Sequence, residues 1–122
     1  MIGYKVVQRR GEELVSVVVW NTDACVVYTP HKKAVPSVPD SRILAFVTLE
    51  DARAFRFGRS PWEIWKAELE DPQAVEWIAP VGLDSKVKER FQAFWIGAAV
   101  FLCLTPWGTV GCTACTLLEK VE

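Results

Sequence analysis

Two pairs of side chains in this sequence combine residue types and a spacing that could carry chemistry. Glu68 and Glu70 are two residues apart, so on a strand they share one face at a separation of about 7 Å. Neighbouring carboxylates divide the acid and base roles of a catalyst when one of them is desolvated. The alternation of apolar and charged residues over 62–70 favours a second interpretation, in which both carboxylates face solvent beside Lys66.

The other pair is Cys112 and Cys115, which have the C-x-x-C spacing of zinc and dithiol sites. A zinc site needs further ligands, and Cys25, Cys103 and His31 form no spaced motif with this pair. On a continuous strand, residues three apart also point to opposite faces. We therefore expect buried thiols that pack as small apolar groups, with no metal and no cofactor.

Arg53 and Arg56 are candidates for binding an anion. On a predicted helix, Arg56 projects between Leu49 and Ala52, on the side that should face a sheet. An arginine in that place must extend to solvent, pair with a carboxylate or bind an anion. Pairing or extension is favoured, and an anion pocket completed by Lys5 is the alternative.

Two further features are candidates for an interaction surface. Lys32 and Lys33 lie in residues 29–41, where three prolines predict a surface loop. Such lysines are usually just solvated; the alternative is contact with an acidic partner or with phosphates. Trp62 and Trp107 each adjoin a proline, and exposed tryptophans at such turns would form a binding patch.

The elements that must position these side chains follow from the pattern of apolar residues. Residues 4–7 and 14–20 predict a hairpin around a Gly-containing turn. Thr48 should cap a helix over residues 49–57, and Ser85 a second amphipathic helix reaching about residue 98. Whether residues 96–104 are helix or strand stays open. The remaining predicted strands are residues 24–28, 43–47, 62–70, 74–78 and 109–121.

These elements predict a single domain over residues 1–122 with an α+β fold: a mainly antiparallel sheet of about six or seven strands, with two helices packed on it. The composition agrees, because 51% of the residues are hydrophobic and 24% are charged. Six Trp and six Phe are many for this length. Each buried ring removes about 150–250 Å² from water, so the aromatic residues alone could anchor one core.

Charge and hydropathy disfavour several classes of partner. Fourteen basic against fifteen acidic residues give a formal net charge of −1, whereas proteins that bind nucleic acid generally carry a basic excess. The first residues lack the basic and apolar segments of a signal peptide, which predicts a cytoplasmic protein with reduced thiols. Residues 91–104 are apolar but shorter than the roughly 20 residues of a membrane span, so a membrane location is disfavoured.

Four blocks of the sequence resemble small uncharacterised proteins of tailed bacteriophages and prophages. The blocks are residues 3–7, 49–55, 64–69, and 106–110 together with 117–119. They are structural in type and correspond to a strand, a capped helix, a second strand and a glycine turn. The resemblance implies a phage or prophage origin, and hence the host cytoplasm, but no particular chemistry.

A fainter resemblance is to ADP-ribosyltransferase-like domains. In that family a strand precedes a short helix opened by Ser or Thr, and a later strand carries a Glu-x-Glu pair. Thr48 and the pair Glu68 and Glu70 match this arrangement. Lys5 stands where the family has Arg or His, which is a departure from the pattern. The resemblance implies an NAD-binding enzyme.

Three hypotheses about function follow from the sequence. The first is a phage or prophage accessory protein that acts by binding a protein partner or a second copy of itself. It rests on the lack of a recognisable catalytic set and on the many aromatic residues. The second is a reduced ADP-ribosyltransferase-like enzyme that uses Glu68 or Glu70. The third is a protein associated with a membrane through residues 91–104.

Overall fold

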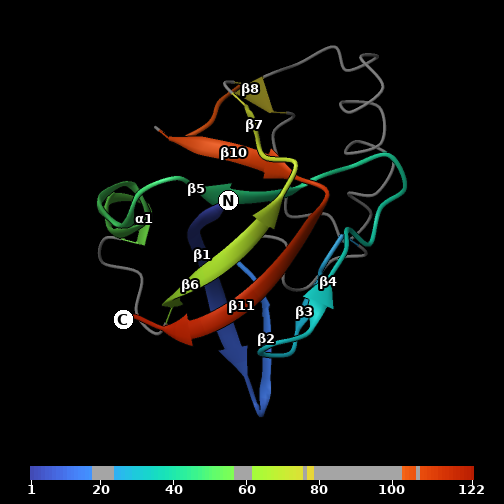
Figure 1. Cartoon of the computed structure of the whole chain (residues 1–122), viewed down its shortest axis with the longest axis vertical. Coiled ribbons are helices and arrows are strands. Elements are labelled where there is room, and N and C mark those ends of the chain that lie inside the picture. The colour runs from blue at the N-terminus through green and yellow to red at the C-terminus, as the bar shows by residue number, and fades with distance from the viewer. Residues whose placement is uncertain (18–23, 57–61, 76, 79–102, 107) are drawn as a thin grey trace.

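The computed structural model describes residues 1–17, 24–56, 62–75, 77–78, 103–106 and 108–122 (Figure 1). Within these ranges the chain forms one helix, α1 (Leu49–Arg56), and eleven strands. The strands are β1 (Ile2–Arg10), β2 (Glu13–Ser16), β3 (Val27–Tyr28), β4 (Lys33–Ala34), β5 (Ile43–Phe46), β6 (Trp62–Glu70), β7 (Gln73–Ala74), β8 (Trp77–Ile78), β9 (Cys103–Leu104), β10 (Thr109–Cys112) and β11 (Ala114–Lys120).

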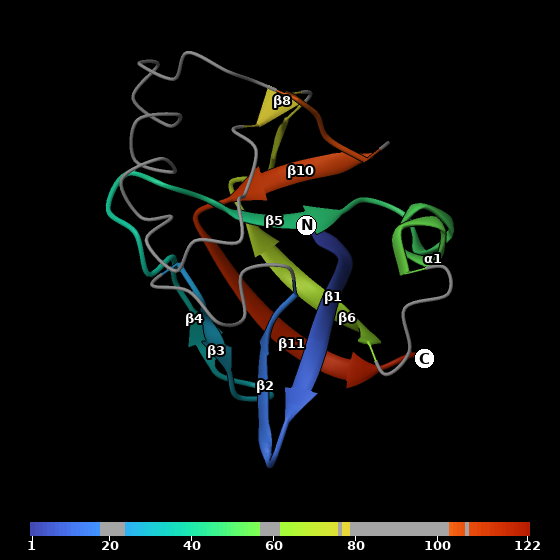
Figure 2. The ribbon, with the colours of Figure 1, turned by 180° about the vertical axis from the view of Figure 1, so that it is seen from behind.

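Nine of the strands form one antiparallel sheet with β1 at its centre. Its order is β4-β11-β6-β1-β5-β10-β7, and a branch adds β2 beside β1 and β3 beside β2. One edge of β1 pairs with β6, while the other edge is shared between β5 and β2. Figure 2 shows the sheet from behind, and both views show it curled so that β3 and β4 lie side by side.

The predicted hairpin at the start of the chain is confirmed by β1 and β2. Their register runs from Val7 opposite Ser16 to Arg10 opposite Glu13. Gly11 in the turn has a φ of +62°, a left-handed conformation that glycine adopts without the steric penalty of a Cβ.

The curled sheet has an inner and an outer face, each with its own apolar cluster. Alternation along β1 turns Lys5 and Val7 to the inner face and Tyr4 and Val6 to the outer face. The inner cluster draws on nearly every strand and consists of Val7, Leu14, Val26, Tyr28, Ala34, Ile43, Ala45, Trp65, Ala67, Leu69, Val110, Cys112, Cys115 and Leu117. The outer cluster is smaller and consists of Val6, Phe46, Ala52 and Ile64.

Helix α1 covers the outer cluster, and its start is the predicted one. The hydroxyl of Thr48 accepts a hydrogen bond from the backbone N–H of Asp51 at 3.1 Å, which is the geometry of an N-cap. Ala52, a residue of α1 itself, is completely buried among the outer-cluster residues of the sheet. The ring of Phe55 lies between those of Phe46 and Trp62, with centroid separations of 5.3 and 5.5 Å, so the aromatic residues fix the helix to the sheet.

The predicted fold class is wrong. The described part of the chain is mostly antiparallel sheet, with nine strands in one sheet and a single helix, so it is not an α+β fold with two helices on a six- or seven-stranded sheet. The second helix, predicted from Ser85 to residue 98, lies outside the described residues. The proline-rich stretch was expected to be a loop throughout, but it contributes strand β4.

The predicted final strand, residues 109–121, is divided in two. Strand β10 pairs with β5, whereas β11 pairs with β6, so the chain changes partners at Thr113. The backbone N–H of Thr113 donates to the carbonyl of Glu70 at 2.9 Å. Pairing between distant strands, which no local pattern encodes, therefore ends one strand and begins the next.

Residues 91–104 were the basis of the membrane hypothesis. Only Cys103–Leu104 of this segment is described, as β9. In the described ranges, no helix has the length and hydrophobicity needed to cross a bilayer.

Candidate functional site

The inner face of the sheet contains an ionisable group that the sequence did not lead us to expect there. Lys5 points inward from β1 and is 7% exposed. Its Nζ donates a hydrogen bond to the carbonyl of Leu44 on β5 at 2.7 Å and lies 5.6 Å from the centre of the Tyr28 ring. None of the ion pairs among the described residues includes Lys5, so a carbonyl and an aromatic face are its polar surroundings.

Burial dominates the electrostatics of this interior. It lowers the pKa of Lys5, an effect that the nearby thiols of Cys115 and Cys112 partly oppose. It also raises the pKa of Tyr28 well above its usual value, against a hydrogen bond with Ser16 that acts in the other direction. Amine and phenol are thus both driven toward their neutral forms.

The two cysteines of the C-x-x-C motif are both buried, as expected, but they lie on the same face of the sheet and not on opposite faces. Because the strand is interrupted at Thr113, Cys112 and Cys115 do not alternate faces, and both are completely buried in the inner cluster. Burial raises the pKa of Cys115 to about 12, and it also raises that of Cys112, although Lys5 acts to lower both. Thiols held in the protonated form are poor nucleophiles and poor metal ligands.

A metal site receives no support from the rest of the described chain. Among the residues whose placement is described, no group of three or more His, Cys, Asp or Glu side chains could hold a metal ion. Cys25 is a half-buried free thiol. Its Sγ contacts the carbonyl of Val26 at 3.8 Å.

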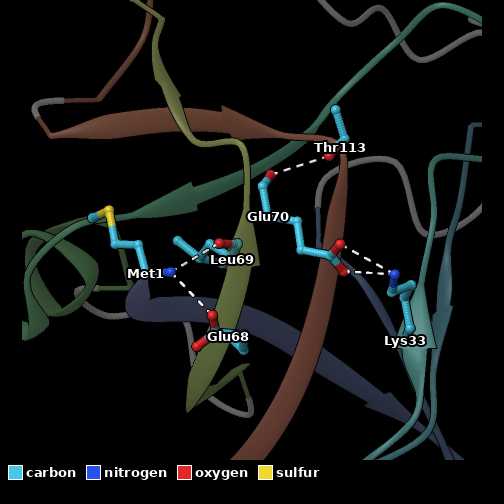
Figure 3. A network of polar contacts seen from close by, with 6 residues as sticks. All are labelled: Met1, Lys33, Glu68, Leu69, Glu70 and Thr113. Atoms are coloured by element: carbon cyan, nitrogen blue, oxygen red, sulfur yellow. Dashed lines mark hydrogen bonds and ion pairs between the residues drawn. The ribbon is translucent and has the colours of Figure 1, made fainter.

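Glu68 and Glu70 lie on the outer face, as the alternation of β6 predicted, and both are ion-paired (Figure 3). Glu68 accepts from the amino group of Met1 at 3.0 Å, and Glu70 pairs with Lys33 at 2.9 Å. Their side chains are 47% and 43% exposed. The desolvation that would separate an acid from a base is therefore not present at this pair.

The structure also separates Lys5 from Glu68 and Glu70, the residues that the ADP-ribosyltransferase resemblance would bring to one site. Ile2 of β1 lies opposite Glu68 of β6, and Lys5 lies opposite Trp65. Lys5 shares the inner face with Trp65, whereas Glu68 points to the outer face. The amine and the carboxylates consequently stand on opposite sides of the sheet.

Lys5 likewise does not join Arg53 and Arg56, which belong to α1 on the outer side. Both arginines instead meet the carboxylate of Glu122: Arg56 Nη2 donates to Oε1 at 3.0 Å, and Arg53 Nε bonds to Oε2. Pairing with a carboxylate was the favoured interpretation of Arg56. The partner, more than sixty residues away in sequence, was not foreseen.

The candidate interaction residues differ in accessibility. Trp62 is half-buried, and its Nε1 donates to the side chain of Gln8 at 3.2 Å; Trp107 lies outside the described residues. Lys32 is exposed. Lys33 is exposed as well but is engaged by Glu70. His31, in the same turn, is exposed with a φ of +68°.

Sequence reasoning missed one polar cluster at the inner face. Glu63 is 8% exposed and accepts two hydrogen bonds from Arg9, at 2.9 and 3.2 Å, and one from Trp65 Nε1 at 3.1 Å. Burial acts to raise the pKa of Glu63, but these hydrogen bonds outweigh it and hold the pKa below its usual value. The sequence pattern could have revealed the burial of Glu63, because Glu63 and the apolar Trp65 are two residues apart on β6 and so face the same side of the sheet.

Comparisons with known proteins do not place the chain in a family. No family model matches it, and neither the curated proteins nor the solved structures contain a significant match. The argument about function therefore rests on the geometry and on the resemblance of the four sequence blocks.

Proposed function

We propose that the chain is a small phage or prophage accessory protein that acts in the host cytoplasm by binding a macromolecular partner. The surface proposed for this contact is the β3–β4 face, which consists of Val27, Lys32, Lys33 and Val35. The observation that supports it is that Val27 and Val35 are 50% and 59% exposed, the highest values among the large apolar side chains of the described residues.

The strand pattern explains why these side chains point outward together. Tyr28 and Ala34, on the neighbouring strands β3 and β4, are both buried in the inner cluster. Since side chains alternate along a strand, Val27 turns to the side opposite Tyr28, and Lys33 to the side opposite Ala34. Val35 follows β4 directly and is exposed. The turn between the strands is closed by the N–H of Lys32, which donates to the carbonyl of Thr29 at 3.0 Å.

Charge defines the partner that this face suits. Lys32 is exposed and has no ion pair among the described residues, while Lys33 already pairs with Glu70. Two exposed valines beside one unpaired amine suit a protein segment that offers apolar side chains next to a carboxylate. The net charge of −1 disfavours nucleic acid as the general partner.

Other surfaces considered from the sequence are less suited to binding. The free edges of the sheet are the two-residue strands β3, β4 and β7. Each has a proline nearby: Pro30 follows β3, Pro36 follows β4 and Pro72 precedes β7. Short edges with prolines offer few backbone groups to an incoming strand. Trp62 packs against the outer cluster and is committed to holding α1.

The test compares this face with a matched apolar site. A photoreactive amino acid would be placed at Val35 in one variant and at Val47, which is 39% exposed after β5, in another. After crosslinking in lysate from a bacterial host, we expect a defined protein adduct from position 35 only. The adduct should be lost when Val27→Ser and Lys32→Glu are added.

Light scattering on the purified protein tests self-association by the same face. Identical adducts from both positions would overturn the proposal. So would adducts that survive Val27→Ser and Lys32→Glu, or a monomeric protein that forms no adduct.

A further inference from the structure

The last turn of α1 carries two guanidinium groups that share one carboxylate. Arg53 and Arg56 are three residues apart and therefore lie on the same side of the helix. Each contacts one oxygen of the Glu122 carboxylate. The side chains of Arg53, Arg56 and Glu122 are 55%, 30% and 27% exposed, so solvent and small solutes reach all three.

Arg53 and Arg56 have many more N–H donors than there are oxygen atoms of the described residues accepting from them. A guanidinium has five N–H donors, and Arg53 and Arg56 each direct one of them to Glu122. Arg42 is the contrast within the same chain. It donates to the carbonyls of Asp71 and Gly111 at 2.8 and 3.2 Å and to the Asp71 carboxylate at 3.0 Å. Arg42 thus makes three hydrogen bonds to protein acceptors, whereas Arg53 and Arg56 make one each within the described part of the chain.

We propose that Arg53 and Arg56 form a binding site for a phosphate-type oxyanion, and that the side chain of Glu122 occupies this site in its absence. Two positive charges face one side-chain carboxylate with two oxygens. A phosphate group carries a charge of about −1.5 to −2 at neutral pH and presents three acceptor oxygens. It therefore matches both the charge and the number of donors better than a carboxylate does, and paired arginines bind such groups through parallel hydrogen bonds.

The exchange of occupants requires only a side-chain movement. The backbone of Glu122 is fixed to β6, because Ile64 N–H donates to the Glu122 carbonyl at 2.8 Å and Val121 N–H donates to the Ile64 carbonyl at 2.8 Å. The Glu122 side chain can rotate away from the arginines while these backbone bonds persist. Glu122 then acts as an internal competitor that a phosphate must displace. This site does not depend on the function proposed for the β3–β4 face.

The experiment titrates the protein with inorganic phosphate, pyrophosphate and phosphoserine at constant ionic strength, and follows the side-chain N–H signals of arginine by NMR. We expect the Arg53 and Arg56 signals to shift on binding. Glu122→Gln removes the competing charge and should tighten binding by about tenfold, since phosphate no longer has to displace charge-assisted hydrogen bonds. Arg53→Gln and Arg56→Gln should each weaken it at least as much.

Arg10→Gln is the matched control, because Arg10 is a similarly exposed arginine paired with Glu13 on a different element. It should leave phosphate binding unchanged. Preference for pyrophosphate or phosphoserine over inorganic phosphate would identify the source of the oxyanion. Equal affinity of the wild type and Glu122→Gln would overturn the proposal, as would phosphate binding that survives both arginine substitutions. Circular dichroism verifies that each variant keeps α1.

Discussion

Replacement of Lys5 by methionine tests whether an amine is buried without a carboxylate partner. Methionine has a similar length and no branching, so it fills the same space on the inner face without needing a hydrogen bond. A buried polar group that lacks full compensation costs about 1–3 kcal/mol in protein mutational data. The bond to the Leu44 carbonyl offsets part of this cost. We expect Lys5→Met to stabilise the fold by about 1 kcal/mol or more at pH 6.

The pH dependence of this effect has a definite sign. The pKa of Lys5 is lowered from 10.5 by burial, so between the folded and unfolded pKa values the unfolded chain binds more protons. The free energy of unfolding then rises with pH in this window, by at most about 1.4 kcal/mol per pH unit for one proton. The stability gained by having Lys5 neutral in both states is complete above pH 10.5, its unfolded pKa, and is lost as the pH falls through its folded pKa. The advantage of Lys5→Met must therefore shrink as the pH rises.

The assay is urea unfolding followed by tryptophan fluorescence for both proteins at pH 6, 7, 8, 9, 10 and 10.5, because the pKa of Lys5 is lowered from 10.5. Cys115, whose raised pKa makes the folded state progressively less stable from pH 9 to about 12, is present in both proteins, so the comparison is made on the difference between them at each pH. Lys32→Met, which removes an exposed amine, is the control and should change the unfolding free energy little at any pH. A Lys5→Met effect that is equal at every pH, or a large loss of stability throughout, would refute the burial argument.

Three further substitutions test other parts of the fold by urea unfolding. Gly3→Ala should destabilise by about 1–3 kcal/mol, because an added Cβ would lie 2.7 Å from the carbonyl oxygen of Phe46; a change below about 0.5 kcal/mol would contradict this close approach. Glu63→Gln should cost about 1 kcal/mol at pH 7 by weakening the pair with Arg9. Since the pKa of Glu63 is lowered from 4.5, that difference should shrink as the pH falls below 4.5 and disappear once it is below the folded-state pKa; persistence in strong acid would argue against it. Thr48→Ala should cost about 1 kcal/mol and Thr48→Ser much less, and equal losses would exclude the capping role.

The local features of the fold were predictable from the sequence. Alternation over residues 62–70 gave the correct faces for Glu68 and Glu70, and the Thr48 cap gave the correct start of α1. The hairpin followed from β-rich runs on either side of Gly11. Each of these signals acts within about ten residues, where propensity and capping chemistry determine the structure.

The errors arose where distant segments pair. The change of partner at Thr113 depends on β5 and β6 being adjacent to β10 and β11, and neither adjacency is written in residues 109–121. The consequence for the C-x-x-C motif was direct, because an assumed continuous strand placed Cys112 and Cys115 on opposite faces. Glu122 likewise meets Arg53 and Arg56 because β11 runs alongside β6 and brings the residues that follow it to α1.

The placement of Lys5 shows why composition alone misjudged the interior. Tyr4, Val6 and Val7 around it are apolar, and the middle of β1 is covered by α1 on one side and by the inner cluster on the other. A polar residue in this middle part of the strand faces one of the two covered sides, whereas Arg9 and Arg10 near the end of β1 are exposed. The interior is therefore not uniformly apolar: it contains an amine, a phenol and two thiols that burial shifts toward their neutral forms. Since the pKa of the amine is lowered and those of the phenol and thiols are raised, acid and alkali act on the same interior through different groups. The amine then weakens the fold as the pH falls from 10.5 through its lowered pKa, and the thiols weaken it as the pH rises above 9.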